Sequence, residues 1–107
     1  MPKAKRGEIW QIDLGLVQKV RPCLILSIEF LDHERAVVTY VPRTTTLRDT
    51  RFEVSHAAPR FEPGAFDAQG IGSIPLVKLM RQVGSVSPED LSRVELAVKR
   101  WLGFSAV

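Results

Sequence analysis

The chain has 107 residues, 45% of them hydrophobic and 25% charged, and its formal net charge of +3 favours a polyanionic partner only weakly. This length and composition predict one soluble globular domain spanning residues 1–107, and no apolar run approaches the length of a transmembrane helix. A single cysteine, Cys23, excludes an internal disulfide and a cysteine-based zinc cluster, and the lack of a signal peptide predicts a cytoplasmic protein.

Alternating and apolar stretches predict three strands in the first half of the chain. In residues 8–14, every second side chain from Trp10 to Leu14 is apolar, which is typical of a half-buried strand. The apolar run at 23–28 predicts a strand buried on both faces. A third strand is expected at 36–41, which is rich in β-branched residues.

The second half is less regular until its last element. Residues 51–55 alternate and predict a fourth strand, whereas residues 57–70, with two prolines and two glycines, are expected to be the least regular part of the chain. A short strand, a helical turn near 76–81 and a strand ending at Val86 should follow.

A capped amphipathic helix closes the chain. Ser87, Pro88 and Asp90 form a helix start signal, and Gly103 is a stop signal. Between them, apolar residues recur at helical spacing: Leu91, Val94, Val98, Trp101 and Leu102. Strands followed by one helix predict an α+β fold, a small, curled, mostly antiparallel sheet closed by the C-terminal helix.

Arg21 is the first candidate functional residue, in the stretch VRPCLIL. Pro22 holds Arg21 in an extended conformation at the entrance of a strand, and a rigid element is a good base for a catalytic cation. A guanidinium matches the geometry of a phosphate with two parallel hydrogen bonds. The simpler interpretation is a surface arginine whose stem covers apolar surface, and the residues alone favour it.

Three threonines form the second candidate group. Thr44, Thr45 and Thr46 end the third strand, next to Arg43, and open a loop that contains Arg48. Hydroxyl groups and arginines together bind phosphate well. A strand end followed by an ordinary solvated loop explains the same pattern equally well.

The remaining chemistry-bearing residues give no such pattern. His33 and His56 are expected to be surface residues, because neither lies in a metal-binding or catalytic-triad motif. Cys23, in an apolar strand, is expected to be an inert core thiol. The sequence also lacks a phosphate-binding GxxxxGK[ST] loop, an HExxH motif and a clustered carboxylate pair, which argues against kinases, zincins and glycosidases of familiar type.

Taken in order, five segments resemble the MazF/PemK toxin family: KRGEIWQIDL, VRPCLILS, VPRTTT, a following strand and SPEDLSRVELAVKRWLG. The resemblance covers roughly residues 5 to 104. It implies an SH3-like barrel of the CcdB/PemK type with an appended helix, usually as a homodimer. It also implies a toxin of a type II toxin–antitoxin system, a metal-independent endoribonuclease without a cofactor that cleaves single-stranded RNA at short sequences. A cognate antitoxin typically blocks such a toxin, and we expect it to use a flexible acidic segment.

The resemblance also assigns residues. The family's catalytic arginine falls on Arg21 and its catalytic threonine on Thr44. We expect Arg21 to stabilise charge that develops on the scissile phosphate, and Thr44 to position the phosphate or the ribose. The RNA-binding residues are expected to be Lys19, Arg43, Thr45, Thr46, Arg48, Lys78 and Arg81.

The chain departs from the family pattern in two places. The loop at 15–19 is shorter than the family's usual loop, and the stretch AQGIGSI lacks the arginine of the D-Q-I-R-T-type strand. Either a basic contact to RNA is missing there, or Lys78 and Arg81 replace it. The interpretation that this chain is a weakened or non-toxic member of the family therefore stays open. Two alternatives belong to other classes: a CcdB-type toxin, which binds DNA gyrase and cleaves nothing, and a module that only binds RNA or protein.

Overall fold

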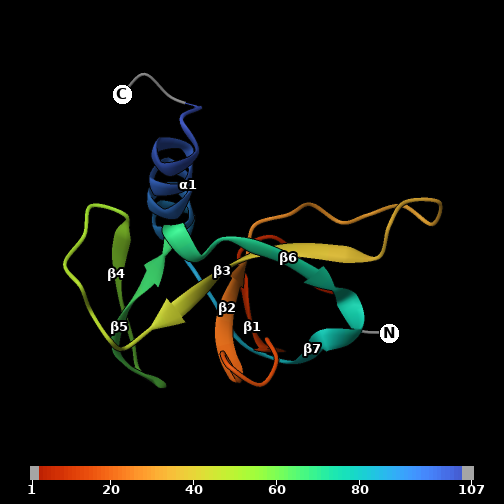
Figure 1. Ribbon diagram of the computed structural model, residues 1–107, viewed down its shortest axis with the longest axis horizontal. Coiled ribbons are helices and arrows are strands. Elements are labelled where there is room, and N and C mark those ends of the chain that lie inside the picture. Colours follow the sequence, from red (N-terminus) through yellow and green to blue (C-terminus); the bar gives the residue numbers. More distant parts are fainter. Residues whose placement is uncertain (1–2, 105–107) are drawn as a thin grey trace.

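A curled antiparallel sheet with one α-helix on one of its faces forms the fold (Figure 1). The computed structural model describes residues 3–104. In this range the elements are β1 (Glu8–Asp13), β2 (Val20–Ile25), β3 (Val37–Thr44), β4 (Glu53–Ala58), β5 (Phe61–Asp67), η1 (Ala68–Gly70), β6 (Gly72–Pro75), η2 (Leu76–Lys78), β7 (Leu79–Ser85) and α1 (Pro88–Leu102), where η marks a 3-10 helix. This order confirms the predicted α+β architecture.

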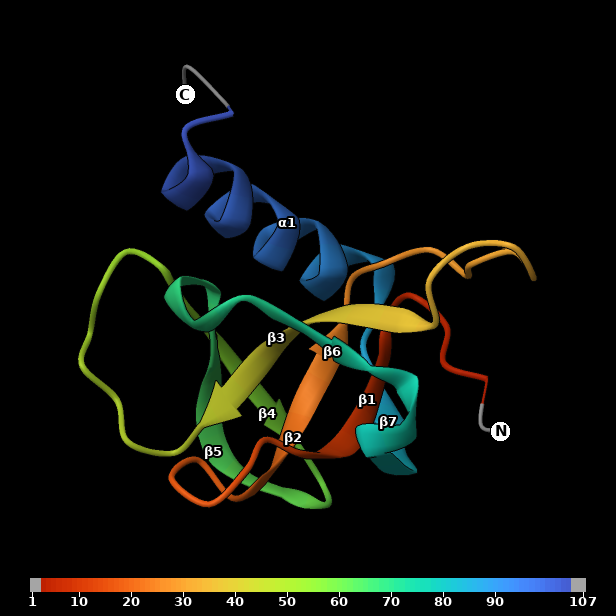
Figure 2. The same cartoon turned by 45° about the vertical axis from the view of Figure 1, so that its right-hand side comes forward.

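The central strand, β3, explains why the sheet curls. The strand order is β4-β5-β3-β2-β1-β7, and β6 pairs with β3 beside this path. Along one edge, residues 37–40 of β3 pair with β6, whereas Arg43 and Thr44 pair with β5. This change of partner turns the β4–β5 hairpin away from the rest of the sheet, so that the sheet closes into a half-barrel, as Figures 1 and 2 show from two sides.

Both faces of the middle strands are buried, each in its own core. On one face, Ile9, Leu24 and Val41 pack with residues of β4, β5 and α1. On the other face, Trp10 and Ile12 belong to a second core, whose buried members also include Cys23, Ile25, Val38, Tyr40, Leu76 and Leu79. The prediction that the second strand is buried on both faces is therefore confirmed. The first strand was expected to be half-buried, which is wrong at Ile9, because this residue is fully buried in the core that also contains the buried residues of α1.

The helix α1 has the predicted bounds and caps. The Ser87 hydroxyl accepts a hydrogen bond from the Asp90 N–H at 3.1 Å, and Gly103 ends the helix in the left-handed region with φ of 76°. Val94, Ala97 and Val98 form its buried stripe, while Trp101 stays partly exposed and packs edge-on against Phe52. Within residues 3–104, no helix combines the length and hydropathy needed to cross a membrane.

Several predicted boundaries shift, since β2 begins at Val20, β3 runs on to Thr44 and β4 covers Glu53–Ala58, and two of the differences follow from strand pairing. Residues 57–70, expected to be irregular, form most of the β4–β5 hairpin. Pro63 is tolerated there because this part of β5 pairs only with β4, whereas the β3 pairing begins at Ala65. The second strand ends at Ile25 rather than residue 28, since the Ser27 hydroxyl accepts the Thr39 N–H and replaces the ladder. The expected strand, helical turn and strand over 71–86 appear as β6, η2 and β7.

Candidate functional site

Arg21 lies on the sheet face opposite α1, at the open end of β2. It pairs with Ile12, whose side chain belongs to the core on that face. The Arg21 side chain is exposed, and its Nε donates to the Gln18 carbonyl at 3.2 Å. Pro22 follows in the strand, so Arg21 has the rigid, extended backbone that the sequence predicted.

Thr44 lies beside Arg21 at the end of β3. Its hydroxyl accepts a hydrogen bond from the Thr46 N–H at 3.0 Å and donates one to the Thr46 carbonyl at 3.3 Å. These two bonds fix the orientation of the hydroxyl in a tight turn. Both threonines line a hollow of about 350 Å³. We call it the Arg21 hollow; its polar side chains are Gln18, Arg21, Thr44, Thr46, Arg48, Glu53 and Asp67.

Two carboxylates in the Arg21 hollow were missed by the sequence analysis. Glu53 accepts the Arg48 N–H with both oxygens, at 3.1 and 3.2 Å, and thereby holds the loop that carries Arg48. Asp67 caps η1 by accepting the Gln69 N–H at 3.1 Å. The hollow therefore offers cations for a phosphate beside carboxylates that accept hydrogen bonds from the backbone. A signal was present for Glu53, because the alternation of residues 51–55 places it opposite Phe52 and Val54.

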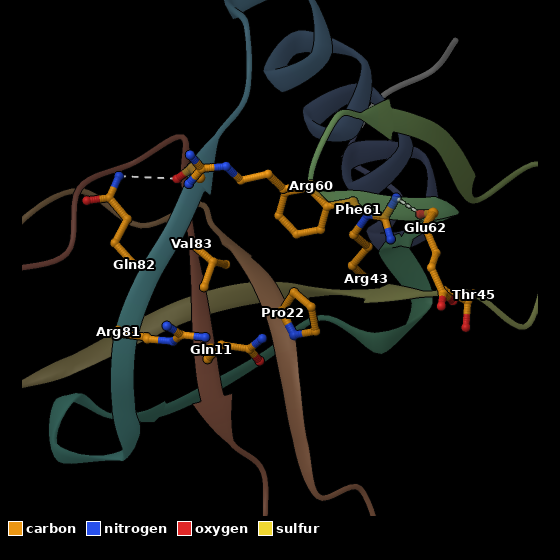
Figure 3. Close-up of a pocket in the computed structure, with 11 residues that line it drawn as sticks. Gln11, Pro22, Arg43, Thr45, Arg60, Phe61, Glu62, Arg81, Gln82 and Val83 are labelled. Carbon is orange, nitrogen blue, oxygen red and sulfur yellow. Dashed lines mark hydrogen bonds between the residues drawn. The ribbon is translucent and has the colours of Figure 1, made fainter.

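A second hollow lies on the other side of the same strand ends. Successive strand residues point to opposite faces, so Arg43 and Thr45 face away from Thr44 and Thr46. Figure 3 shows this second hollow, of about 640 Å³, which we call the Arg43 hollow. Its lining includes Pro22, Arg43, Thr45, Arg60, Phe61 and Arg81.

The structure thus divides the predicted site residues. Arg21, Thr44, Thr46 and Arg48 meet in the Arg21 hollow, whereas Arg43, Thr45 and Arg81 line the Arg43 hollow. Lys19 and Lys78 line neither of these two hollows: Lys19 is exposed in the loop after β1, and Lys78 is exposed at the end of η2.

Arg43 and His56 depart most from their predicted environment. Both were expected at the surface, yet Arg43 is 5% and His56 6% exposed. Arg43 Nε donates to His56 Nδ1 at 2.9 Å, so the neutral ring serves as the acceptor. Burial, and then the neighbouring Arg43 charge, lower the pKa of His56 below its usual 6.5, while Asp90 opposes this shift. Arg43 is accordingly part of a buried polar cluster at the base of its hollow.

Cys23 is the core thiol that the sequence predicted. It is fully buried, and its Sγ contacts the Arg21 carbonyl at 3.5 Å. Burial raises the pKa of this thiol to about 12, so it is protonated at neutral pH and inert as a nucleophile.

Comparisons with known proteins show the family and the fold of this chain. A family model described as a PemK-like, MazF-like toxin of type II toxin–antitoxin systems matches residues 5–102. An endoribonuclease from a mycobacterial species, solved in complex with its cognate antitoxin, is 26% identical; the match covers 97% of this chain and 99% of that chain, with a TM-score of 0.83. Mycobacterium tuberculosis toxin MazF-mt6 is 28% identical over 90% of this chain and 96% of that chain, with a TM-score of 0.78.

A MazE–MazF structure from Deinococcus radiodurans is 20% identical, covers 98% of this chain and 100% of that chain, and has a TM-score of 0.82. At this identity the likeness concerns the fold alone, and it confirms the barrel-type sheet with one C-terminal helix. No curated protein sequence matches the chain significantly.

Proposed function

Because the chain belongs to the family of PemK-like, MazF-like toxins of type II toxin–antitoxin systems, we propose that it is an endoribonuclease that cleaves single-stranded RNA at short sequences. The meeting of Arg21 from β2 with Thr44 and Arg48 from the end of β3 and its following loop, in one hollow, carries this proposal. The mycobacterial endoribonuclease, which aligns over nearly the whole of both chains, supports it.

The proposed reaction uses the RNA as its own nucleophile. The ribose 2′-oxygen forms a bond to phosphorus, the bond from phosphorus to the 5′-oxygen breaks, and a 2′,3′-cyclic phosphate results. The 2′-OH proton passes to a base and the 5′-oxygen gains a proton, so no water is consumed in this step. The Arg21 guanidinium stabilises the negative charge that grows on the non-bridging oxygens. Thr44 holds the phosphate or the ribose, since a hydroxyl is a poor base.

The chemical ends of the products test this reaction. We expect a 2′,3′-cyclic phosphate, or the 3′-phosphate formed when it opens, together with a 5′-hydroxyl. Full activity is expected in EDTA, because the 2′-OH replaces a metal-bound water as the nucleophile. Mass spectrometry of a cleaved oligonucleotide gives the ends, and a substrate with one deoxyribose at the scissile position is the matched control.

A 5′-phosphate product, or cleavage restored only by added magnesium, would contradict the proposed reaction. Cleavage of the deoxyribose control would do so as well, because this substrate lacks the nucleophile. RNA binding without any cleavage would instead favour the module that only binds RNA.

A cognate antitoxin is the second proposed partner, and the active form is proposed to be a homodimer. We propose that a flexible acidic segment of the antitoxin competes with RNA for the Arg21 hollow, whose exposed cations Arg21 and Arg48 attract either polyanion. Arg43 drops out of this shared surface, because it is buried on the other side of the strand ends.

Charge reversal at Arg48 tests the shared site. Arg48→Glu should weaken the binding of labelled, non-cleavable RNA and of an acidic antitoxin peptide alike, and binding of both should weaken as salt rises. Arg35→Glu is the matched control, because Arg35 is exposed in the turn before β3, at the opposite end of this strand from Thr44. Simultaneous binding of both ligands without mutual effect would mean that their sites are separate.

A further inference from the structure

A buried guanidinium joins three strands at the point where β3 ends. Arg43 Nη2 donates to the His56 carbonyl at 2.9 Å and to the Glu62 carbonyl, in addition to the Nε contact with His56 Nδ1. The guanidinium carbon lies 4.9 Å from the centre of the Phe61 ring, and the His56 ring lies 4.8 Å from the Phe66 ring. A buried cation is stable only when its donors are satisfied, so these acceptors are an essential part of the local fold.

The end of β3 has few other attachments. Its ladder with β2 runs only to Pro42, and its last two residues pair with β5 through Arg43–Phe66 and Thr44–Ala65. The Arg43 side chain extends this short ladder, because it crosses β5 and reaches β4. The contacts of Arg43 therefore attach the end of β3 to β4 and β5, and they fix the position of Thr44, the next residue along the chain.

We propose that Arg43 and His56 are positioning residues that hold the Thr44 hydroxyl in the Arg21 hollow, and that protonation of His56 releases this hold. The inference rests on the proposed ribonuclease function. It adds two residues that do not touch the reacting atoms and makes the reaction sensitive to pH.

The chemistry of the imidazole gives the direction of this sensitivity. Neutral His56 accepts from Arg43 at Nδ1, so its own proton is on Nε2. The imidazolium has a proton on both nitrogens, which removes the acceptor and places a second cation against Arg43. Two other elements pack around His56. The helix α1 carries Asp90, whose charge favours the protonated ring. The strand β5 carries the Phe61 and Phe66 rings, which contact the His56 ring, and its Glu62 carbonyl accepts a hydrogen bond from Arg43.

The same logic fixes the pH range. The pKa of His56 is lower in the folded protein than its usual 6.5, so the unfolded chain binds this proton more readily. The stabilising contribution of neutral His56 is therefore complete above 6.5, and it is lost as the pH falls below that value toward the folded pKa. The Arg43–His56 contact that positions Thr44 is therefore intact at neutral pH and is lost only in the acidic range.

Steady-state cleavage of single-stranded RNA, with kcat and KM measured between pH 8 and pH 5, tests the proposal. Wild-type protein should lose kcat on an acid limb with a midpoint below 6.5, while KM changes little. His56→Ala should lower kcat at neutral pH by at least about tenfold, because a misplaced Thr44 no longer meets the phosphate. His56→Asn should restore most of that loss and flatten the acid limb, since the Asn oxygen lies near the position of Nδ1 and accepts from Arg43 without titrating.

An acid limb in His56→Asn identical to that of the wild type would overturn the proposal, as would a wild-type rate and profile in His56→Ala. Nuclear magnetic resonance separates this inference from the proposed function. The Thr44 amide resonance of the wild type should titrate together with the His56 ring, below pH 6.5, and should not do so in His56→Asn. If the Thr44 amide resonance of the wild type does not titrate with the His56 ring, the inference is wrong even if RNA is cleaved. If the shift occurs but the wild type cleaves no RNA, the positioning of Thr44 by Arg43 and His56 is supported and the proposed ribonuclease function is wrong.

Discussion

Replacing Arg21 with alanine is expected to slow RNA cleavage by about 10²–10³-fold, the usual loss when one preorganised contact to a developing charge is removed. Arg21 lies at a rigid strand end, and its guanidinium makes one hydrogen bond, to the Gln18 carbonyl, within the described chain. Since the side chain is exposed, the free energy of unfolding should change by no more than about 0.5 kcal/mol. Single-turnover rates on a mapped RNA site, with thermal denaturation of the same samples, measure both quantities.

Two further variants make this result specific. Arg21→Lys keeps the charge and loses the two-pronged geometry, so it should recover only part of the rate. Thr44→Ala should also slow cleavage strongly, whereas Thr44→Ser keeps the hydroxyl and should lose less. If Arg21→Ala cleaves at close to the wild-type rate with unchanged thermal stability, the proposed role of the guanidinium is wrong.

Elements with local signals were predicted well from the sequence. The helix α1 depends on a cap, a start residue and a period that all lie within 88–102, so its bounds and most of its buried stripe were predicted. The β4 strand was predicted in part, at 51–55, but β5 was missed because the prolines of residues 57–70 suggest irregular structure. Its ladder with β3 connects Thr44 to Ala65, about twenty residues away, and no local pattern reveals such a pairing.

The candidate site shows the same division. Arg21, Thr44 and Arg48 were predicted from local patterns and a family resemblance, and they meet in one hollow. Arg43 was assigned to the same surface because arginines and hydroxyl groups together bind phosphate well. Alternation along β3 places Arg43 on the face of buried Val41, which was a usable signal. Its acceptors on β4 and β5, which make burial of the charge possible, could not be predicted without the fold.

Replacing Gly64 with alanine is expected to have the second large effect, on stability and cleavage together. A methyl group at this position would lie 2.5 Å from the Thr44 carbonyl oxygen and 2.9 Å from Arg43 Nη1. Both distances are too short, and one of the atoms belongs to the backbone, so β3 and β5 must separate where Thr44 pairs. Overpacking of this kind typically costs about 1–3 kcal/mol of unfolding free energy. Because it displaces Thr44, we expect cleavage to fall by about 10²-fold.

Gly84→Ala is the matched control, and a double variant identifies which contact matters. At Gly84 the added methyl group would lie 3.3 Å from the edge of the Phe61 ring, a side chain rather than the backbone, so both properties should change less than in Gly64→Ala. In Arg43→Ala/Gly64→Ala the contact with the guanidinium disappears while the contact with the Thr44 carbonyl remains. We therefore expect Arg43→Ala not to rescue the melting temperature of Gly64→Ala. Because Arg43→Ala by itself removes contacts that hold Thr44, the cleavage rate of the double variant is compared with that of Arg43→Ala alone, and it should fall below it. Full rescue would mean that the guanidinium alone clashes, and that the backbone at Thr44 is free to move without loss of function.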